Sequence, residues 1–262
     1  MKSTSTHPNQ VGRVENYPTH MLGTEVTSSE RRAAKHNVTK SNDLVRAAYR
    51  LTLNEQRLLL AAISQIDPRK LMPRPITITA YDFSEHFGIP IKQAYEALKE
   101  AAGSLYERDI KTFDGRYKSR FRWVDRVDYQ SGWAEAKIWF TIHVEPYLAM
   151  LNTEFTKYDL KRVAGLSSIH SIRLFELLQG FKKTGMYTVR VDEFRALLEL
   201  GPSYTRYSNL KSKVIDPAIE ELRRKSGLLI ELKATKSRRS IDRLTFKFHD
   251  DQQTQLALAD DL

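Results

Sequence analysis

The chain has 262 residues and a formal net charge of +10 at pH 7, and it contains no cysteine, which excludes disulfide bonds, thiolate catalysis and cysteine-ligated zinc. A positive charge of this size favours a polyanionic partner, nucleic acid ahead of an anionic membrane, although it also suits a merely soluble basic protein. No apolar run is long enough to span a membrane and the polar N-terminus lacks a secretory signal, so we expect a cytoplasmic protein without a membrane partner.

The first half of the chain predicts helices followed by strands. Residues 1–40 are rich in Ser, Thr, His and Asn and lack apolar periodicity, so we predict a disordered tail. The leucine-rich segment Leu51–Ile66 predicts a core helix capped by Thr52 or Asn54, since two heptads are too few for a zipper. The elements expected next are a strand at 75–79, helices at 80–87 and 90–105, and strands at 109–113, 119–129 and 134–142.

The second half predicts the same order of elements. The segment Thr188–Phe194 also resembles Thr77–Phe83, since each reads as a strand, an acidic residue and a phenylalanine that starts a helix. The elements expected here are a helix at 168–183, a strand at 187–191, a helix capped by Asp192 and running to Leu200, a helix at 203–225, and hairpin arms at 228–234 and 243–248 around a tip at 236–240.

Helix, strand, helix, helix and hairpin is the order of a winged helix, a helix-turn-helix with a β-hairpin wing. The repeated order predicts an α+β protein with two tandem winged-helix domains related by internal duplication. The predicted divisions are a disordered N-terminal tail at 1–40, a first winged-helix domain at 41–152, a second at 153–249 and a flexible C-terminal tail at 250–262.

The helix at 203–225 carries the main candidate site. Its apolar positions form one buried face, while polar and cationic side chains crowd its N-terminal end. Arg and Lys suit guanine and Asn suits adenine in the major groove, and hydroxyl groups suit phosphates. The candidate DNA-binding residues are Ser203, Tyr204, Arg206, Tyr207, Ser208, Asn209, Lys211 and Lys213. The alternative is a solvated cationic helix end without a ligand.

Two further cationic segments are candidates for contacts with the DNA backbone. The tip of the last hairpin suits the phosphate backbone or the minor groove, unless it only solubilises the protein. Its candidates are Lys236, Ser237, Arg238 and Arg239. In the first domain, cations alternate with aromatic residues over positions 111–126. This pattern fits contact with the DNA backbone, but it also fits strands whose aromatic side chains point inward and whose cations point outward. The first-domain candidates are Lys92, Gln93, Lys99, Lys111, Arg116, Lys118, Arg120 and Arg122.

Catalytic motifs give little support for an enzyme. The seven histidines form no His-x-His pair, which a metal-dependent nicking initiator needs, and no glycine-rich loop precedes a Lys-Ser or Lys-Thr pair. No Gly-x-Ser-x-Gly elbow is present. We therefore predict a protein that is not an enzyme, with no catalytic residues, no bound metal and no cofactor.

Several stretches, taken in order, resemble the iteron-binding plasmid replication initiators, a family with two tandem winged-helix domains. The matching stretches are Leu51–Leu58, Ile142–Leu148, Phe155–Leu160, Ser171–Glu176 and Tyr204–Leu222. The resemblance implies binding of direct repeats as a monomer, opening of the origin, and recruitment of the host initiator and the replicative helicase. It also implies a homodimer in equilibrium with the monomer, which binds an operator inverted repeat and represses its own gene, with copy-number control as the result.

The resemblance further implies that the second domain reads bases and that the first domain, with its helix Leu51–Ile66, carries the dimer contact. The C-terminal segment Gln255–Leu262 faintly resembles peptides that dock on a sliding clamp, although an inert frayed tail also fits it. Two alternatives stay open at this point: a winged-helix transcriptional repressor without a replication role, and a nicking enzyme of the rolling-circle type.

Overall fold

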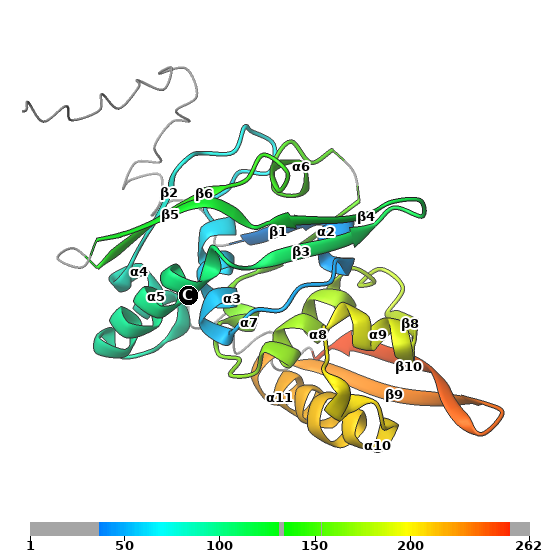
Figure 1. Cartoon of the computed structure of the whole chain (residues 1–262). Coiled ribbons are helices and arrows are strands. Elements are labelled where there is room, and N and C mark those ends of the chain that lie inside the picture. The colour runs from blue at the N-terminus through cyan, green and yellow to red at the C-terminus, as the bar shows by residue number, and fades with distance from the viewer. Residues whose placement is uncertain (1–36, 131–133, 153, 252–262) are drawn as a thin grey trace, which may run out of the picture.

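The structure, a computed structural model, describes residues 37–130, 134–152 and 154–251 (Figure 1). The chain forms two lobes, each with a three-stranded antiparallel sheet. The first lobe consists of α3 (Leu53–Ile63), β2 (Ile76–Thr79), α4 (Ala80–Phe87), α5 (Ile91–Leu105), β3 (Asp109–Phe113), β4 (Lys118–Arg122), β5 (Val124–Gln130), β6 (Glu135–Phe140) and α6 (Glu145–Leu148).

The second lobe follows, and two N-terminal elements belong with it. Its elements are β7 (Phe155–Asp159), α7 (Lys161–Ala164), α8 (Ile169–Gln179), β8 (Met186–Arg190), α9 (Val191–Leu197), the 3₁₀ helix η3 (Pro202–Tyr204), α10 (Tyr207–Leu210), the π-helical turn η4 (Lys211–Ile215), α11 (Asp216–Ser226), β9 (Leu228–Ser237) and β10 (Ser240–Asp250). The N-terminal elements are β1 (Asn37–Ser41) and α2 (Asn42–Arg46).

The two lobes share one topology. The strand order is β2-β6-β5 in the first lobe and β8-β10-β9 in the second, and in both a helix pair separates the first strand from the hairpin. This arrangement confirms the predicted α+β fold with two tandem winged helices. The hairpins β5-β6 and β9-β10 are therefore the two wings. The turn of the first wing, residues 131–133, lies outside the described residues.

Two helices of the first lobe begin at the same kind of cap. Thr52 accepts a hydrogen bond from the Glu55 N–H, and the Glu55 carboxylate accepts one from the Thr52 N–H. Thr79 and Asp82 repeat this reciprocal pair at the start of α4. The prediction that Asp192 caps α9 is wrong, because α9 begins at Val191 without a side-chain cap. Asp192 lies in its first turn instead, where it pairs with Arg195.

Helix α3 lies in the middle of the core of the first lobe. Leu58, Leu59 and Leu60 are all buried, as are the three residues that follow them. Six consecutive residues cover every side of a helix, so this part of α3 is enclosed all around. These leucines are therefore unavailable to a second copy of the chain, and a dimer contact needs another surface.

The predicted helix at 203–225 is interrupted at its start. Ser203 and Tyr204 lie in η3, and the continuous helical run extends only from Tyr207 to Ser226. Within it, the Asp216 N–H donates to the Lys211 carbonyl, five residues back, in the π-helical turn. Pro217 follows directly and has no N–H of its own, and its ring would clash with a carbonyl of the preceding turn. The wider turn accommodates that ring.

The predicted strand at 119–129 is two strands that belong to different sheets. Trp123, fully buried, separates β4 from β5, and β4 pairs only with β3 in a two-stranded hairpin. The hairpin β3-β4 has no counterpart among the described elements of the second lobe. The first-domain candidates at positions 111–122 thus lie on this hairpin, which is inserted ahead of the wing, rather than on the wing itself. They are Lys111, Arg116, Lys118, Arg120 and Arg122.

The predicted N-terminal tail is wrong for residues 37–40. Strand β1 pairs antiparallel with β7, and Val38 and Lys40 are buried. Residues 1–36 lie outside the described residues. At the other end, Asp250 still belongs to β10, whereas 252–262, including most of the proposed tail and the Gln255–Leu262 peptide, lie outside the described residues.

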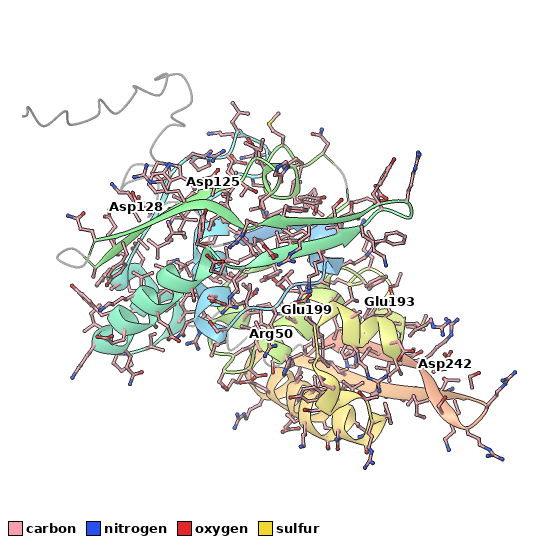
Figure 2. The ribbon with its side chains drawn as sticks, in the orientation of Figure 1. Arg50, Asp125, Asp128, Glu193, Glu199 and Asp242 are labelled. Carbon is pink, nitrogen blue, oxygen red and sulfur yellow. The ribbon has the colours of Figure 1, made fainter. Side chains whose placement is uncertain are left out.

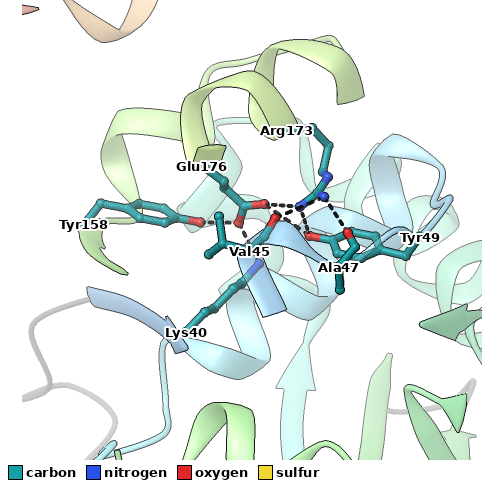
Figure 3. A network of polar contacts seen from close by, with 7 residues as sticks. All are labelled: Lys40, Val45, Ala47, Tyr49, Tyr158, Arg173 and Glu176. Carbon is teal, nitrogen blue, oxygen red and sulfur yellow. Dashed lines mark hydrogen bonds and ion pairs between the residues drawn. The ribbon is translucent and has the colours of Figure 1, made fainter. Parts of the chain in front are cut away.

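A buried polar network holds the N-terminal segment on α8 (Figure 3). The Lys40 ammonium donates to Glu176 Oε1 at 2.6 Å, and the Tyr158 hydroxyl donates to the same oxygen at 2.6 Å. Arg173 donates to the Ala47 carbonyl at 3.0 Å and to the Tyr49 hydroxyl. Burial alone would raise the pKa of Glu176, but the nearby Lys40 and Arg173 and the hydrogen bonds lower it, so the carboxylate stays ionised.

Tyr49 joins the two lobes within this network. Its hydroxyl donates to Glu176 Oε2 at 3.2 Å in the second lobe, while its ring packs edge-on against Trp123 of the first lobe, with 5.1 Å between ring centroids. The neighbouring Ala48 forms two backbone hydrogen bonds with Lys111 of β3. The segment that crosses from one lobe to the other is therefore fixed on both sides.

Candidate nucleic-acid interface

The second wing is a long cationic hairpin. The predicted tip at 236–240 is too wide, because β9 continues to Ser237 and β10 begins at Ser240. Only Arg238 and Arg239 form the turn, and Lys236 and Ser237 lie in the last positions of β9. Figure 1 shows the hairpin projecting beyond the helices of its lobe, and Figure 2 shows nitrogen-tipped side chains at its end.

Arg238 occupies an unusual backbone conformation for its residue type. Its φ of 54° lies in the left-handed region, at the first position of a two-residue hairpin turn where glycine is the usual residue. The side chains of Arg238, Arg239 and Lys236 are exposed and form no ion pair with another described residue. Their charge is therefore available to an external anion.

The helical run Tyr207–Ser226 holds the position of the recognition helix in a winged helix and is called by that name below. At its start, Arg206 and Lys213 are equally available. Arg206 is the N-cap residue of α10, both side chains are exposed, and neither has an ion-pair partner within the described ranges. Ser208 is exposed in the same first turn. The first two turns of the helical run thus present two free cations and a hydroxyl, at the end where backbone N–H groups also favour anions.

Other predicted DNA-binding residues are engaged locally. The Lys211 ammonium donates to both oxygens of Asp216 at 2.7 Å, and these contacts raise its pKa. The Asn209 amide donates to the Ser203 carbonyl at 3.0 Å and so helps to hold η3 against α10. Tyr204 and Tyr207 are half-buried, and burial raises the pKa of Tyr207. These four residues shape the helix start as well as its surface.

Arg195 was missed by the sequence analysis. Its guanidinium donates to the Tyr204 carbonyl at 2.9 Å and to the Thr205 carbonyl at 2.5 Å, and it pairs with Asp192 at 2.8 Å. It therefore fixes the loop that leads into the recognition helix. A single arginine on a short helix carries no sequence signal for this role.

The first-domain candidates fall into two groups. Lys92, Gln93 and Lys99 are exposed on α5, the helix equivalent to the second recognition helix. On the inserted hairpin, by contrast, several cations already have carboxylate partners. These contacts are Lys111 with Glu199, Arg120 with Asp109, and Arg122 with Glu107 at 2.8 Å. Exposed pairs of this kind contribute about 0–1 kcal/mol, yet they reduce the charge that the hairpin offers to DNA.

The remaining hairpin candidates stay exposed. The Arg116 guanidinium lies 5.0 Å from the centre of the Tyr117 ring, and Lys118 is exposed beside them. The contact between Lys111 and Glu199 instead connects the first lobe with the loop after α9. The inserted hairpin therefore joins the lobes as well as presenting cations.

The described residues contain no group of three or more His, Cys, Asp or Glu side chains that could hold a metal ion. Within the same residues, no helix is both long and apolar enough to cross a membrane. That the chain is not an enzyme stays a prediction.

The comparisons with known proteins agree with two successive winged-helix units, although the first family model extends through β7, α7 and α8 of the second lobe. The family model described as "Initiator Replication protein, WH1" matches residues 37–179, and the one described as "Initiator Rep protein, WH2" matches residues 190–248. The predicted domain boundary at residue 152 stays a prediction. Strand β1, which precedes this boundary in the sequence, pairs with β7, which follows it.

Relatives and a solved structure are also similar to this chain. A replication initiation protein of Escherichia coli is 27% identical over 84% of this chain and 71% of its own. A probable replication protein of Bifidobacterium longum is 32% identical over 34% of this chain and 31% of its own. The crystal structure of Pi initiator protein in complex with iteron DNA is similar in fold, with a TM-score of 0.71 and 21% identity over 84% of this chain and 99% of that chain.

Proposed function

The chain belongs to the initiator replication protein family, and we propose that it initiates plasmid replication by binding direct repeats, or iterons, in the plasmid origin. The observation that carries the proposal is the free cationic surface of the second lobe. Arg206 and Lys213 at the recognition helix and Arg238 at the wing lie on one lobe without ion-pair partners among the described residues. A helix for the major groove beside a basic wing suits duplex DNA.

The roles of the two parts differ. In the recognition helix, Arg206 and Lys213 are placed to read base edges, while Ser208 and the free backbone N–H groups hold a phosphate. The wing residues Lys236 and Arg238 contact the backbone of the same duplex, which adds affinity without sequence preference. Helix α5 of the first lobe, through Lys92 and Lys99, contacts a neighbouring stretch of the same repeat.

The proposed regulation rests on the resemblance of the sequence to its family. The monomer binds direct repeats, opens the origin and recruits the host initiator and replicative helicase. A homodimer binds an inverted repeat at the chain's own promoter, represses transcription and so limits copy number. The exposed apolar side chains Phe113 and Ile142 on the first lobe offer surface for the dimer contact, in place of the buried leucines of α3. All of these events take place in the cytoplasm.

Two measurements test the proposal together. Binding of the full chain to direct-repeat, inverted-repeat and scrambled duplexes is followed by fluorescence anisotropy over a salt series. A plasmid that carries the origin is then introduced into cells with or without the chain. We expect preferred binding to direct repeats and replication only when the chain is supplied.

Other outcomes favour other functions. Binding to the inverted repeat alone, without replication, would favour a transcriptional repressor. Cleavage of supercoiled origin DNA in the presence of a divalent metal would favour a nicking enzyme. Equal binding to all three duplexes would mean that the basic surface coats DNA without reading it.

A further inference from the structure

A cavity of about 410 Å³ lies between the two lobes. Its walls come from the crossing segment Tyr49–Thr52, from the start of α8, and from the loop Leu198–Tyr204 that leads into the recognition helix. Figure 2 labels Arg50 and Glu199 at this junction. The volume falls in the range of small-molecule sites, roughly 300–1,000 Å³, and exceeds what one bound water needs.

Three arginines line the cavity: Arg50, Arg108 and Arg173. The carboxylate among the lining residues, Glu199, already forms an ion pair with Lys111. Arg108 donates its Nε to Glu55 at 2.8 Å, but its two terminal nitrogens form no hydrogen bond within the described residues. Since Glu55 pairs with Arg108 and Glu176 with Arg173, Arg50 is the lining arginine that no described carboxylate neutralises.

Each of these arginines has donors without partners in the described part of the chain. Arg50 is exposed at the cavity and forms no ion pair there. Arg173 is 2% exposed, and although its terminal nitrogens bind the buried network, its Nε is buried without a hydrogen-bond partner. Buried donors in native proteins are almost always satisfied. The exposed guanidinium of Arg50 and the unpaired terminal nitrogens of Arg108, at the wall of the same cavity, therefore suit an anionic ligand.

The remaining lining groups suit a flat, uncharged part of the same ligand. His170 lies at the start of α8 with its ring 6.5 Å from the Tyr204 ring, and the two are nearly perpendicular. Burial, together with the nearby Arg50, lowers the pKa of His170, so its imidazole is neutral at pH 7. A neutral aromatic ring can stack on a base, and an arginine can bind a phosphate.

We propose that this interlobe cavity binds the phosphate of a nucleotide, with Arg50 and Arg108 as its principal contacts. The phosphate belongs either to a free mononucleotide or to a strand of bound DNA, since both present the same oxygens to the arginines. The site goes beyond the proposed binding of repeats by the recognition helix and the wing, because none of its arginines belongs to either.

Occupancy would act on the DNA-reading surface through the loop Leu198–Tyr204. This loop lines the cavity, and Arg195 holds the Tyr204 carbonyl on its other side. A ligand that joins this loop to Arg50 on the crossing segment restrains the recognition helix relative to the first lobe. Binding at the cavity should therefore change the affinity for a site that both lobes contact.

The test uses the full chain without DNA. Isothermal titration calorimetry with inorganic phosphate, AMP and ATP is run on the wild type and on Arg50→Gln, Arg108→Gln and Arg69→Gln. Arg69 is the matched control, since it is exposed and pairs with Asp67 away from the cavity. Thermal unfolding of each variant tests whether its fold is retained, because Arg108→Gln removes the ion-pair partner of the buried Glu55, whereas Arg50→Gln breaks no ion pair of the described residues.

Saturable nucleotide binding that weakens at least about tenfold in Arg50→Gln and Arg108→Gln, but not in Arg69→Gln, supports a free nucleotide. If nucleotides fail to bind, the affinities of the wild type and the variants for repeat and scrambled duplexes show whether the cavity binds a phosphate of DNA. A loss in Arg50→Gln on both duplexes, with the salt slope reduced by about one, assigns the phosphate to DNA. Nucleotide binding that is insensitive to both cavity variants overturns the proposal. So does an absence of nucleotide binding with unchanged duplex affinities. If the wild type binds repeat and scrambled duplexes equally, the proposed function fails, whereas the nucleotide titration still tests the cavity.

Discussion

Lys40 and Glu176, 136 residues apart in the sequence, form an ion pair of 2.6 Å in which both side chains are almost fully buried. Removing one member of a buried pair leaves an uncompensated charge, which typically costs about 3–5 kcal/mol. We expect Glu176→Gln to lower the free energy of unfolding by about that amount, because Lys40 and Arg173 would both lose a carboxylate. Urea denaturation followed by circular dichroism measures the change.

The control is Asp67→Asn, which breaks the exposed pair with Arg69 and should change stability by less than about 0.5 kcal/mol. Equal and small effects of both substitutions would contradict the view that the network anchors the N-terminal segment.

Glu221 gives the stability a pH dependence. Burial opposes its ionisation, but hydrogen bonds from Lys225 and Ser167 outweigh this and lower its pKa to about 2 from an ordinary value of 4.5. The folded pKa lies below the unfolded one, so its contribution is fully present above pH 4.5 and is lost as the pH falls toward 2. We expect Glu221→Gln to lose roughly 1–3 kcal/mol at pH 7 and to flatten the decline of stability between those pH values.

Unfolding free energies from pH 2 to pH 7 for the wild type and Glu221→Gln measure this effect. Parallel curves across the whole range would show that Glu221 contributes nothing through its charge. Glu231→Gln, an exposed carboxylate on β9, is the matched control.

Arg206 and Lys236 should separate specific from general DNA binding. Arg206→Ala should weaken direct-repeat binding by roughly 1–3 kcal/mol and scrambled DNA much less, because a base contact is lost. Lys236→Ala should weaken both duplexes alike and reduce the salt slope by about one, because a phosphate contact is lost. Fluorescence anisotropy from 50 to 300 mM salt measures both. A uniform loss in Arg206→Ala would place that residue on the backbone instead.

Arg238 allows stability and DNA binding to be separated at one position. Glycine adopts the left-handed conformation of Arg238 without the steric cost that other residues pay. Arg238→Gly should therefore leave stability unchanged or raise it by up to about 1 kcal/mol, while weakening DNA binding at low salt. Thermal unfolding and anisotropy on the same preparation measure the pair. Unchanged DNA affinity would remove the wing turn from the interface.

Asp216 restrains a cation that the sequence analysis assigned to base reading. Asp216→Asn frees the Lys211 ammonium and removes a negative charge from the recognition helix, so we expect affinity for duplex DNA to rise a few-fold. The same anisotropy assay measures it, with Asp192→Asn as a control because Asp192 pairs with Arg195 outside the helix. A lower affinity in Asp216→Asn would mean that the ion pair itself holds Lys211 in its DNA-binding position.

Local patterns predict the parts of this fold that depend on local chemistry. The Thr52 cap of α3 and the alternating strands act within a few residues, so the order of elements can be predicted from the sequence. Pro217 was visible too, but the π-helical turn before it depends on how the whole helix packs. The split at Trp123 could not be read, because β4 and β5 form one uninterrupted strand-like run in the sequence.

The candidate site was predictable in its location more than in its residues. Cations at a helix start and a hairpin tip mark a DNA-binding surface by their type alone. Which of them are free depends on partners from elsewhere, as with Lys111 and Glu199 of different lobes. Arg50 and His170 gave no signal, because the cavity that unites them exists only after the two lobes meet. Lys40 reads as part of a polar tail until its partner on α8 is known.

The pairing of β1 with β7 also sets an order of events during translation. Strand β1 leaves the ribosome before the whole first lobe, yet its partners are β7 and the Glu176 carboxylate far downstream. The first lobe can fold while β1 waits unpaired, since domains fold as they emerge from the ribosome. The second lobe is then completed by the earliest of the described strands, and this lobe stays incomplete until β7 and α8 have left the ribosome.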